Sequence, residues 1–243
     1  ESAGEYTITL TVKVGAKAGL GHSISPFKQI FTGSGTNPSS GSFSSNIHTN
    51  ALIRAEIGND IKSIKYNAFY GCENLESVNI PTSITSILSN AFMDCLKLQW
   101  ISNIHDLAIS NYALTKNGLR RATFGGGCYA YGTSFTFEYN TYLKRVVLPT
   151  TYNLIGSCDY RYCTALVEVI CNNIKKIGST AFFGCYSLKK LDLTRNTEIP
   201  TLESDSVFQK TAADLEILVP AALAEEWKAA TNWTTYANNI KGV

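Results

Sequence analysis

Hydrophobic residues recur along this chain at fixed offsets, with a period close to 23 residues. Between positions 61 and 81 the recurring positions are Ile61, Ile64, Ala68, Phe69, Cys72, Leu75, Val78, Ile80 and Pro81. The same order of side-chain types returns from Ile84 to Ile101 and again from Ile174 to Leu193. Repetition at a fixed period of this size is typical of a solenoid.

Weaker copies occupy the rest of the central region. They keep, in chain order, Leu52, Ala55 and Ile57; then Leu119, Ala122 and Phe124; then Leu143, Val146, Leu148 and Pro149; then Ile155, Asp159, Tyr160, Cys163, Leu166, Val169 and Cys171; and last Phe208, Ile217, Val219 and Pro220. The stretch 103–160 departs most from the pattern. Together the units predict about seven turns of 22–24 residues between positions 46 and 220.

Each half of the repeat predicts a different local structure. The Leu-x-x-Val-x-Ile half ends with apolar residues at every second position, which indicates a short strand facing a core. In the other half, Asn67 and Asn90 precede an Ala-Phe pair. Asparagine favours helix N-caps, so we expect one tight helical turn on the wall opposite the strands. Because one unit cannot bury its own apolar face, the units must stack, and their strands then form a parallel sheet.

The two ends of the chain differ from the repeats. Residues 6–14 alternate apolar and polar, which predicts a strand, and residues 33–46 are rich in Gly, Ser, Thr, Asn and Pro, which predicts a loop. We interpret residues 1–45 as an N-terminal β cap, the alternative being the remnant of a small β-domain. Residues 221–243 should form a helical cap, because Leu223, Trp227 and Ala230 share one helical face after Pro220. A partner-binding helix is the alternative there.

The repeat from Ile61 to Pro81 resembles the bacterial leucine-rich repeats of the BspA type. The resemblance covers about 175 of the 243 residues, and the ending from Ile217 to Ile240 also resembles the terminal segment of that family. It implies an α/β fold, a right-handed leucine-rich-repeat solenoid with a parallel β-sheet on one face. It further implies an extracellular or cell-surface protein, including a lipid-anchored outer-membrane form, that adheres to host or bacterial partners. The family has no shared catalytic residues to carry over, and a scaffold motif does not specify a ligand.

Composition excludes some classes of protein without choosing a partner. Charged residues make up only 16% of the chain and the net charge is +2, so nothing favours nucleic acid as a ligand. No run of 18 apolar residues is present to span a membrane. The chain opens at Glu1 without a methionine, from which we expect that a targeting segment has been removed.

The seven cysteines follow the repeat. Cys72, Cys95, Cys163 and Cys185 share one position on the expected core side, where a free thiol acts as a small apolar residue. Disulfides between stacked turns are the alternative, since neighbouring turns lie within disulfide range. Cys158 lies outside this series, and we expect it to be the most exposed thiol.

No catalytic, cofactor or metal motif is recognisable. The histidines are His22, His48 and His105, and none has a second histidine at metal-binding spacing. Gly125–Gly127 precede no Lys-Ser or Lys-Thr pair, so they predict a loop and not a phosphate cradle. We expect a non-enzymatic protein without cofactors.

The outward positions of the predicted sheet carry the candidate partner-binding residues. These are Trp100, Arg120, Arg121, Lys144, Arg145, Val147, Ile170 and Lys190, together with Tyr129 and Tyr131 from the tyrosine-rich degenerate stretch. Stacking should align the basic residues into one patch that attracts an acidic protein surface or an anionic glycan. The alternative is that Lys and Arg only protect an exposed sheet from aggregation and that the tyrosines fill irregular turns.

These features favour an adhesion or binding protein, monomeric, that binds a protein partner on the concave sheet face. A carbohydrate-binding surface module that uses the tyrosines, whose rings and hydroxyls suit sugars, is the alternative.

Overall fold

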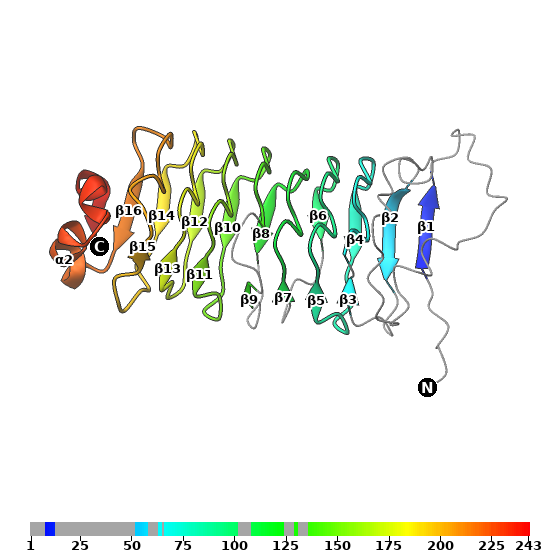
Figure 1. Cartoon of the computed structure of the whole chain (residues 1–243), viewed down its shortest axis with the longest axis horizontal. Helices are drawn as coiled ribbons and strands as arrows, with labels where there is room; N and C mark the ends of the chain where they lie inside the picture. The colour runs from blue at the N-terminus through cyan, green and yellow to red at the C-terminus, as the bar shows by residue number, and fades with distance from the viewer. Residues whose placement is uncertain are drawn as a thin grey trace.

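The computed structural model is an elongated solenoid in which successive turns of chain stack along one axis (Figure 1). It describes residues 8–12, 52–57, 63–64, 66–101, 108–123, 129–130 and 136–243, with only the backbone described at 8–12, 52, 100, 108, 121–123 and 129–130. The expected N-terminal cap over residues 1–45 therefore lies largely outside the described residues.

Strands from successive turns line one wall of the solenoid. They are β1 (Ile8–Val12), β2 (Leu52–Ile57), β4 (Ser77–Asn79) and β6 (Trp100–Ile101) in one sheet, and β8 (Arg121–Thr123), β10 (Arg145–Val147), β12 (Glu168–Ile170), β14 (Lys190–Asp192), β16 (Glu216–Val219) and β17 (Ile240–Gly242) in another. All pairs are parallel except β1 with β2, which is antiparallel. The predicted parallel sheet is confirmed, and its N-terminal edge strand is the one expected within residues 6–14.

The register of this wall places equivalent repeat positions side by side. Val146 pairs with Val169, which pairs with Leu191, which pairs with Ile217. All four side chains are fully buried, whereas the residues on either side of each face outward. The offsets read from the hydrophobic pattern are therefore the offsets of the core.

Short strands also line a second wall, which the sequence did not predict. They are β3 (Ser63–Ile64), β5 (Ser86–Ile87), β7 (Ala108–Ile109) and β9 (Tyr129–Ala130), followed by β11 (Leu154–Ile155), β13 (Lys176–Ile177) and β15 (Thr201–Leu202). Every one of these strands except β9, whose side chains are not described, contributes a buried residue, such as Ile64, Ile155 or Ile177, to the same core.

The expected helical turn around Ala-Phe is wrong: these residues form a tight turn that is bonded to the next coil. Phe69 N–H donates to the Ala91 carbonyl at 2.7 Å and Gly71 N–H donates to the Met93 carbonyl at 2.9 Å. N–H groups that point along the solenoid axis are unavailable for helical bonds. Asn67 and Asn90 have φ of 58° and 59°, so asparagine is favoured here by its tolerance of the left-handed region and not by N-capping.

A continuous stack of side chains fills the core behind this turn. Parallel rings lie 5.0 Å apart at Phe69 and Phe92, and 5.3–5.5 Å apart along the series Phe137, Tyr160, Phe182 and Phe208. Leu114 occupies the equivalent position between the two series and is fully buried. The degenerate units thus keep the core position, and Asp159-Tyr160 aligns with Ala-Phe as the sequence indicated.

The cysteine position of the repeat is a hydrogen-bond donor position. The thiols of Cys95, Cys163 and Cys185 donate to the carbonyl oxygens of Phe69, Phe137 and Tyr160 in the preceding turn, at 3.0, 3.2 and 3.0 Å. Where the repeat has no cysteine, Asn140 donates to the Leu114 carbonyl at 2.7 Å in the same way. The six cysteines in the described residues are unpaired, which confirms free thiols. Cys158 is the most exposed of the six described thiols, as expected, but at 8% exposure it is still buried, with its sulfur 3.1 Å from the Thr180 hydroxyl.

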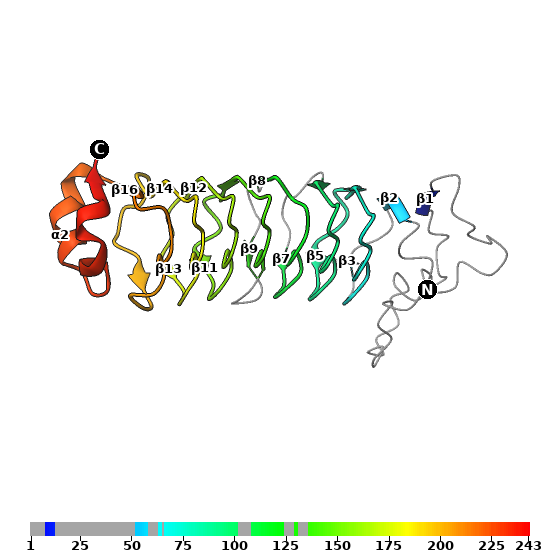
Figure 2. The same ribbon diagram turned by 90° about the horizontal axis from the view of Figure 1, so that it is seen from above.

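The stack follows a nearly straight axis in both views (Figures 1 and 2). A strongly concave face needs one wall of the solenoid to be wider than the other. Here both walls consist of short strands and turns, which repeat at the same spacing of about 4.8 Å. The expected concave sheet is therefore a nearly flat strip.

A helical segment covers the last turn, as predicted. It comprises a 3-10 turn η2 (Ala221–Leu223), α2 (Ala224–Ala229) and a second 3-10 segment η3 (Trp233–Asn239). Trp227 and Trp233 are fully buried and meet edge to face at 5.7 Å, and the Trp233 indole donates to the Pro200 carbonyl at 2.8 Å. Phe208, the last ring of the stack, packs against Trp233. Within the described residues no helix is long and apolar enough to cross a membrane.

Candidate binding surface

The outward side chains of β10, β12, β14 and β16 form a strip that we call the sheet face. Two rows run along it, one on each side of the buried central residue of every strand. The first row contains Arg145, Glu168, Lys190 and Glu216, and the second contains Val147, Ile170, Asp192 and Leu218. Because the period of a strand is two residues, every turn adds one member to each row.

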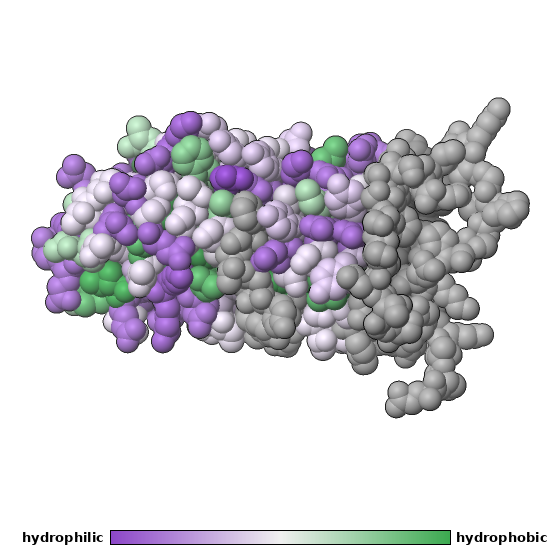
Figure 3. All heavy atoms as spheres, viewed as in Figure 1, coloured by the Kyte–Doolittle hydropathy of each residue, from purple (hydrophilic) through white to green (hydrophobic). Residues whose placement is uncertain are grey.

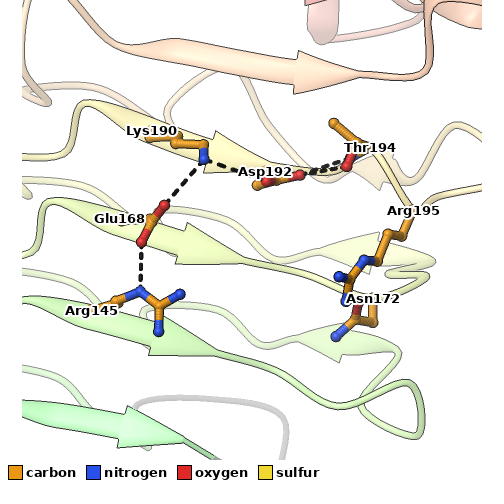
Figure 4. A network of polar contacts seen from close by, with 7 residues as sticks. All are labelled: Arg145, Glu168, Asn172, Lys190, Asp192, Thr194 and Arg195. Atoms are coloured by element: carbon orange, nitrogen blue, oxygen red, sulfur yellow. Dashed lines mark hydrogen bonds and ion pairs between the residues drawn. The ribbon is translucent and has the colours of Figure 1, made fainter. Parts of the chain in front are cut away.

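Opposite charges alternate along the first row, and Glu168 binds the cation on each side of it (Figure 4). Glu168 accepts from Arg145 at 2.6 Å and lies 3.2 Å from Lys190, whose ammonium is also 3.6 Å from Asp192 on the same strand. The hydrogen bond from Arg145, assisted by Lys190, lowers the pKa of Glu168. Burial would raise the pKa of Asp192, but hydrogen bonds from Thr194 and the nearby Lys190 lower it overall. All these carboxylates are therefore ionised near neutral pH.

The second row is largely apolar. Val147 and Ile170 are adjacent in register and half-buried, and Leu218 is half-buried two strands further on. The sequence interpretation selected Val147 and Ile170 but missed Leu218, although the alternation in Ile217-Leu218-Val219 is the same signal. Aliphatic side chains beside arginine are typical of protein interfaces.

A third row lies just before the strands, and we call it the leading row: Arg120, Lys144, Val167 and Lys189. Backbone bonds of 2.9–3.0 Å join its members, from Lys144 N–H to Arg120, from Val167 N–H to Lys144 and from Lys189 N–H to Val167. All four side chains are exposed. Lys189 is 2.8 Å from the Asp214 carboxylate.

The structure thus gathers most of the candidate residues but divides the expected basic patch. Arg145 and Lys190 share Glu168, whereas Arg120 and Lys144 have no ion pair among the described residues. Arg121 lies in register with Arg145, and its side chain is not described. Trp100 begins β6, which belongs to the other sheet of this wall.

The tyrosines do not form one cluster with the arginines. Tyr129 is in β9 on the second wall, and Tyr131 lies outside the described residues. Tyr152 and Tyr160 are buried in the core, where Tyr160 takes the place of the repeat phenylalanine. Tyr142, by contrast, is 59% exposed, two residues before Lys144 in the leading row.

A second aromatic series lies at the outer edge of the turns. Tyr139 stacks on Tyr162 at 5.1 Å, and Tyr162 meets Phe183 edge to face at 5.6 Å. Arg161 lies over the Tyr162 ring and pairs with Glu138. Mutual stacking covers ring faces that a sugar would otherwise use, so Tyr139 and Tyr162 are better suited to stabilising the turns than to binding a glycan.

The described residues present no reactive centre on this surface. They contain no group of three His, Cys, Asp or Glu side chains that could hold a metal ion. Burial raises the pKa of the Cys72 thiol to about 12 and raises those of Cys95, Cys163, Cys171 and Cys185 well above their usual range. A thiol that stays protonated is not a nucleophile. The arrangement suits recognition by contact.

The chain matches a known repeat family. The model of the BspA type leucine-rich repeat region matches residues 39–134 and 133–220, in six copies. No curated protein matches the chain at a significant level.

Several solved structures are similar. A leucine-rich repeat protein from Bacteroides ovatus is 19% identical, with 70% of this chain and 56% of that one covered and a TM-score of 0.42. A leucine rich cell surface protein from Faecalibacterium prausnitzii is 17% identical, with 82% and 81% covered and a TM-score of 0.34. A leucine-rich repeat protein from Eubacterium ventriosum is 14% identical, with 71% and 67% covered and a TM-score of 0.32. The chain spans 56% of the length of the Bacteroides protein.

Proposed function

Because the chain belongs to the family of BspA-type leucine-rich repeat proteins, we propose that it is a non-enzymatic adhesion or binding protein whose sheet face binds another protein. The observation that carries this proposal is the apolar row of that face. Val147, Ile170 and Leu218 are half-buried and face outward between charged side chains. A protein surface of mixed apolar and charged side chains at fixed spacing is suited to another protein.

The face seen in Figure 3 supports a partner that associates reversibly. In the view of Figure 3, hydrophobic residues form small, separate groups among hydrophilic ones. Interfaces of proteins that also exist apart have about the same apolar fraction as the rest of the surface. We therefore propose a monomer that associates with its partner reversibly.

We place this protein outside the cell, secreted or attached to the surface, including attachment by a lipid anchor in an outer membrane. A secreted protein with unpaired thiols must protect them from oxidation. Six thiols in the described residues are buried, and the pKa of Cys72 is raised to about 12, so thiolate, the form that oxidises, is scarce. Buried thiols that donate to backbone carbonyls are compatible with an oxidising environment.

Matched variants on the two walls test the proposal. Ile170 in β12 and Leu154 in β11 are both outward-facing, half-buried aliphatic residues, but they lie on opposite walls. We would measure binding of the labelled full chain to intact epithelial cells and to immobilised fibronectin, laminin and fibrinogen. Ile170→Glu should weaken binding about tenfold or more, since a charge in an interface core costs more than about 1.4 kcal/mol. Leu154→Glu should leave it unchanged. Equal effects of the two, or no binding to any of these surfaces, would contradict the proposal.

Carbohydrate binding is a second candidate, favoured by the exposed rings of Tyr142 and Tyr186. Both are more than half exposed, and their turns lie two apart, which is about 10 Å along the axis on the strand spacing, at neighbouring positions of the repeat. Rings at this distance could contact successive sugars of a chain. Binding of the chain to a glycan array that is lost in Tyr142→Ala, and not in Tyr139→Ala, would favour this candidate over the first.

A further inference from the structure

The positively charged side chains of the sheet face and the leading row fall into two groups. The groups differ in whether carboxylates of the same chain neutralise them. On β14 and at the residue before it, each cation has a carboxylate: Lys189 has Asp214, and Lys190 has Glu168 and Asp192. At the turns that carry β8 and β10 the situation is different. Arg120 and Lys144 are exposed and form no ion pair within the described part of the chain.

The fold brings four cations together at these two turns. Arg120 accepts a backbone bond from Lys144, and the next residues, Arg121 and Arg145, are cross-strand partners in parallel register. Arg145 shares Glu168 with Lys190, Arg120 and Lys144 have no carboxylate partner among the described residues, and the side chain of Arg121 is not described. Like charges directly opposite each other on a sheet are destabilising. We call this set, Arg120, Arg121, Lys144 and Arg145, the cationic step.

Apolar side chains border the cationic step. Val167 follows Lys144 in the leading row and is 41% exposed, and Tyr142 lies two residues before Lys144. Val147 follows Arg145 by two residues and is half-buried on the sheet face. An anionic polysaccharide offers carboxylates or sulfates, and a sugar ring for Tyr142, but no aliphatic side chain to cover Val147 and Val167. An acidic segment of a protein offers both carboxylates and aliphatic side chains.

From this juxtaposition we propose that the cationic step is the docking site for an acidic segment of the partner protein, with its carboxylates on Arg120, Lys144 and their neighbours and an apolar side chain over Tyr142 and Val167. The inference rests on the proposed function and names the chemistry of its partner. Guanidinium groups suit carboxylates because they can donate two parallel hydrogen bonds to one. At β14 the carboxylates of this chain already neutralise the lysines, so this part of the same surface would not attract the acidic segment.

The leading row supplies a matched control for the test. Lys144 and Lys189 are equivalent lysines two turns apart, one in the cationic step and one paired with Asp214. Changing either to glutamate alters the net charge of the chain equally. Any effect of overall charge alone must therefore be the same for Lys144→Glu and Lys189→Glu.

The probes are a short peptide in which glutamate alternates with leucine and phenylalanine, the same peptide with glutamine for glutamate, and heparin. Binding of each to the full chain would be measured by fluorescence polarisation at ~0.05 M and ~0.3 M NaCl, since the higher salt shortens the range of charge interactions. We expect the acidic peptide to bind and the glutamine peptide to bind at least about fivefold more weakly. Lys144→Glu and Arg120→Glu should each weaken binding of the acidic peptide about fivefold, whereas Lys189→Glu should weaken it less than about twofold.

Each other outcome overturns the inference. Equal losses in Lys144→Glu and Lys189→Glu would mean that only net charge matters. Binding of heparin but not of the acidic peptide, with the same dependence on Lys144, would assign the cationic step to a sulfated glycan. If neither probe binds, no acidic segment docks here. The failures stay separable: when Ile170→Glu abolishes binding to cells and matrix proteins but Lys144→Glu does not, the proposed function stands and this inference falls.

Discussion

Gly71 and Gly184 occupy equivalent positions, two residues after the stacked ring of their turn, and their φ angles are 70° and 74°. Non-glycine residues also adopt this left-handed conformation here, among them Asp94, Tyr139 and Tyr162. The repeat therefore imposes the conformation, and glycine is favoured but not required. What distinguishes the two glycines is their surroundings: a methyl group at Gly184 would lie 2.6 Å from the Tyr162 ring, whereas nothing lies within 4 Å at Gly71.

Replacing each glycine with alanine should separate the cost of backbone strain from the cost of crowding against a neighbouring side chain. In both variants an alanine must adopt the left-handed conformation, which lowers the free energy of unfolding by about 1–2 kcal/mol. Gly184→Ala also pushes against Tyr162, which adds about 1–3 kcal/mol of overpacking. Urea denaturation of both variants measures the difference, with Gly71→Ala as the control. Equal destabilisation would mean that the Tyr162 ring moves aside at no cost and that its stacking on Tyr139 does not stabilise the turns.

Asp159 is the one residue of the stacked turns where a carboxylate takes the place of alanine. It is buried and accepts the Gly156 and Thr136 N–H groups at 2.7 and 3.1 Å. Burial outweighs these hydrogen bonds and raises its pKa to about 6. The folded state therefore holds this proton more tightly than the unfolded state, in which the pKa is about 3.9.

The sign of the resulting pH dependence follows from that difference. Between about pH 4 and pH 6 the folded chain binds more protons at this site than the unfolded chain, so the free energy of unfolding falls as the pH rises and then levels off. The upper bound is about 3 kcal/mol, at about 1.4 kcal/mol per pKa unit. Carboxylates with lowered pKa, such as Glu168, contribute the opposite slope in both proteins, so the free energy of unfolding of the native chain minus that of Asp159→Asn should fall over this pH range when both are denatured at several pH values. Parallel profiles for the two proteins would refute the assignment.

At the scale of elements, the C-terminal helical segment replaces the next turn of the solenoid. Trp227 in α2 is fully buried and contacts Trp233, which packs on Phe208, the end of the ring stack. An open end would expose this apolar surface and the edge of the sheet. The segment thus stabilises the last turns by covering them.

Trp227→Ala should cost about 3–5 kcal/mol in the free energy of unfolding, because it leaves a large cavity between the helix and the last turn. Glu226→Ala, an exposed change in the same helix, should stay within about 0.5 kcal/mol of the native chain. Urea denaturation checks both. A small loss at Trp227 would mean that the solenoid end is stable without its helical cover.

The same scale shows what the sequence could predict. Buried strand positions were predictable because Val78, Val169 and Leu191 must be apolar in every turn, which leaves a periodic trace. The turn at Asn67 was not, because asparagine is favoured both at helix N-caps and in the left-handed region, and composition does not distinguish the two. The second wall was missed because each of its strands has only two residues. Such strands are too short to show an alternation.

At the scale of the molecule, the position of the candidate surface was predictable from the sequence. Which of its charged side chains neutralise one another was not. The repeat places Arg145, Glu168 and Lys190 in one row, and this follows from the offsets alone. Which of them neutralise each other depends on side-chain reach between turns: Glu168 contacts both neighbours, whereas Lys144 and Arg120 have no carboxylate in the described residues. The wall that carries Tyr129 could not be assigned from the sequence, because an irregular stretch gives no offset.

Stacked turns contact mainly their neighbours, so local stability should vary along the axis. The wall sheet is divided, with β4 and β6 in one part and β8 to β17 in the other. The C-terminal part has an unbroken ring series from Phe137 to Phe208 and the helical segment at its end, whereas the N-terminal series ends after Phe92 at Leu114.

The amides of β4 should therefore exchange with solvent hydrogen sooner than those of β12, as measured by hydrogen exchange with mass spectrometry. The Trp227→Ala variant sharpens the test. Because coupling passes from turn to turn, loss of the helical cover should speed exchange most in β16, less in β14 and least in β4. Uniform acceleration along the chain would show that the solenoid opens as one cooperative unit. In that case the cationic step near β8 and β10 would be held by the whole stack and not by its own neighbouring turns.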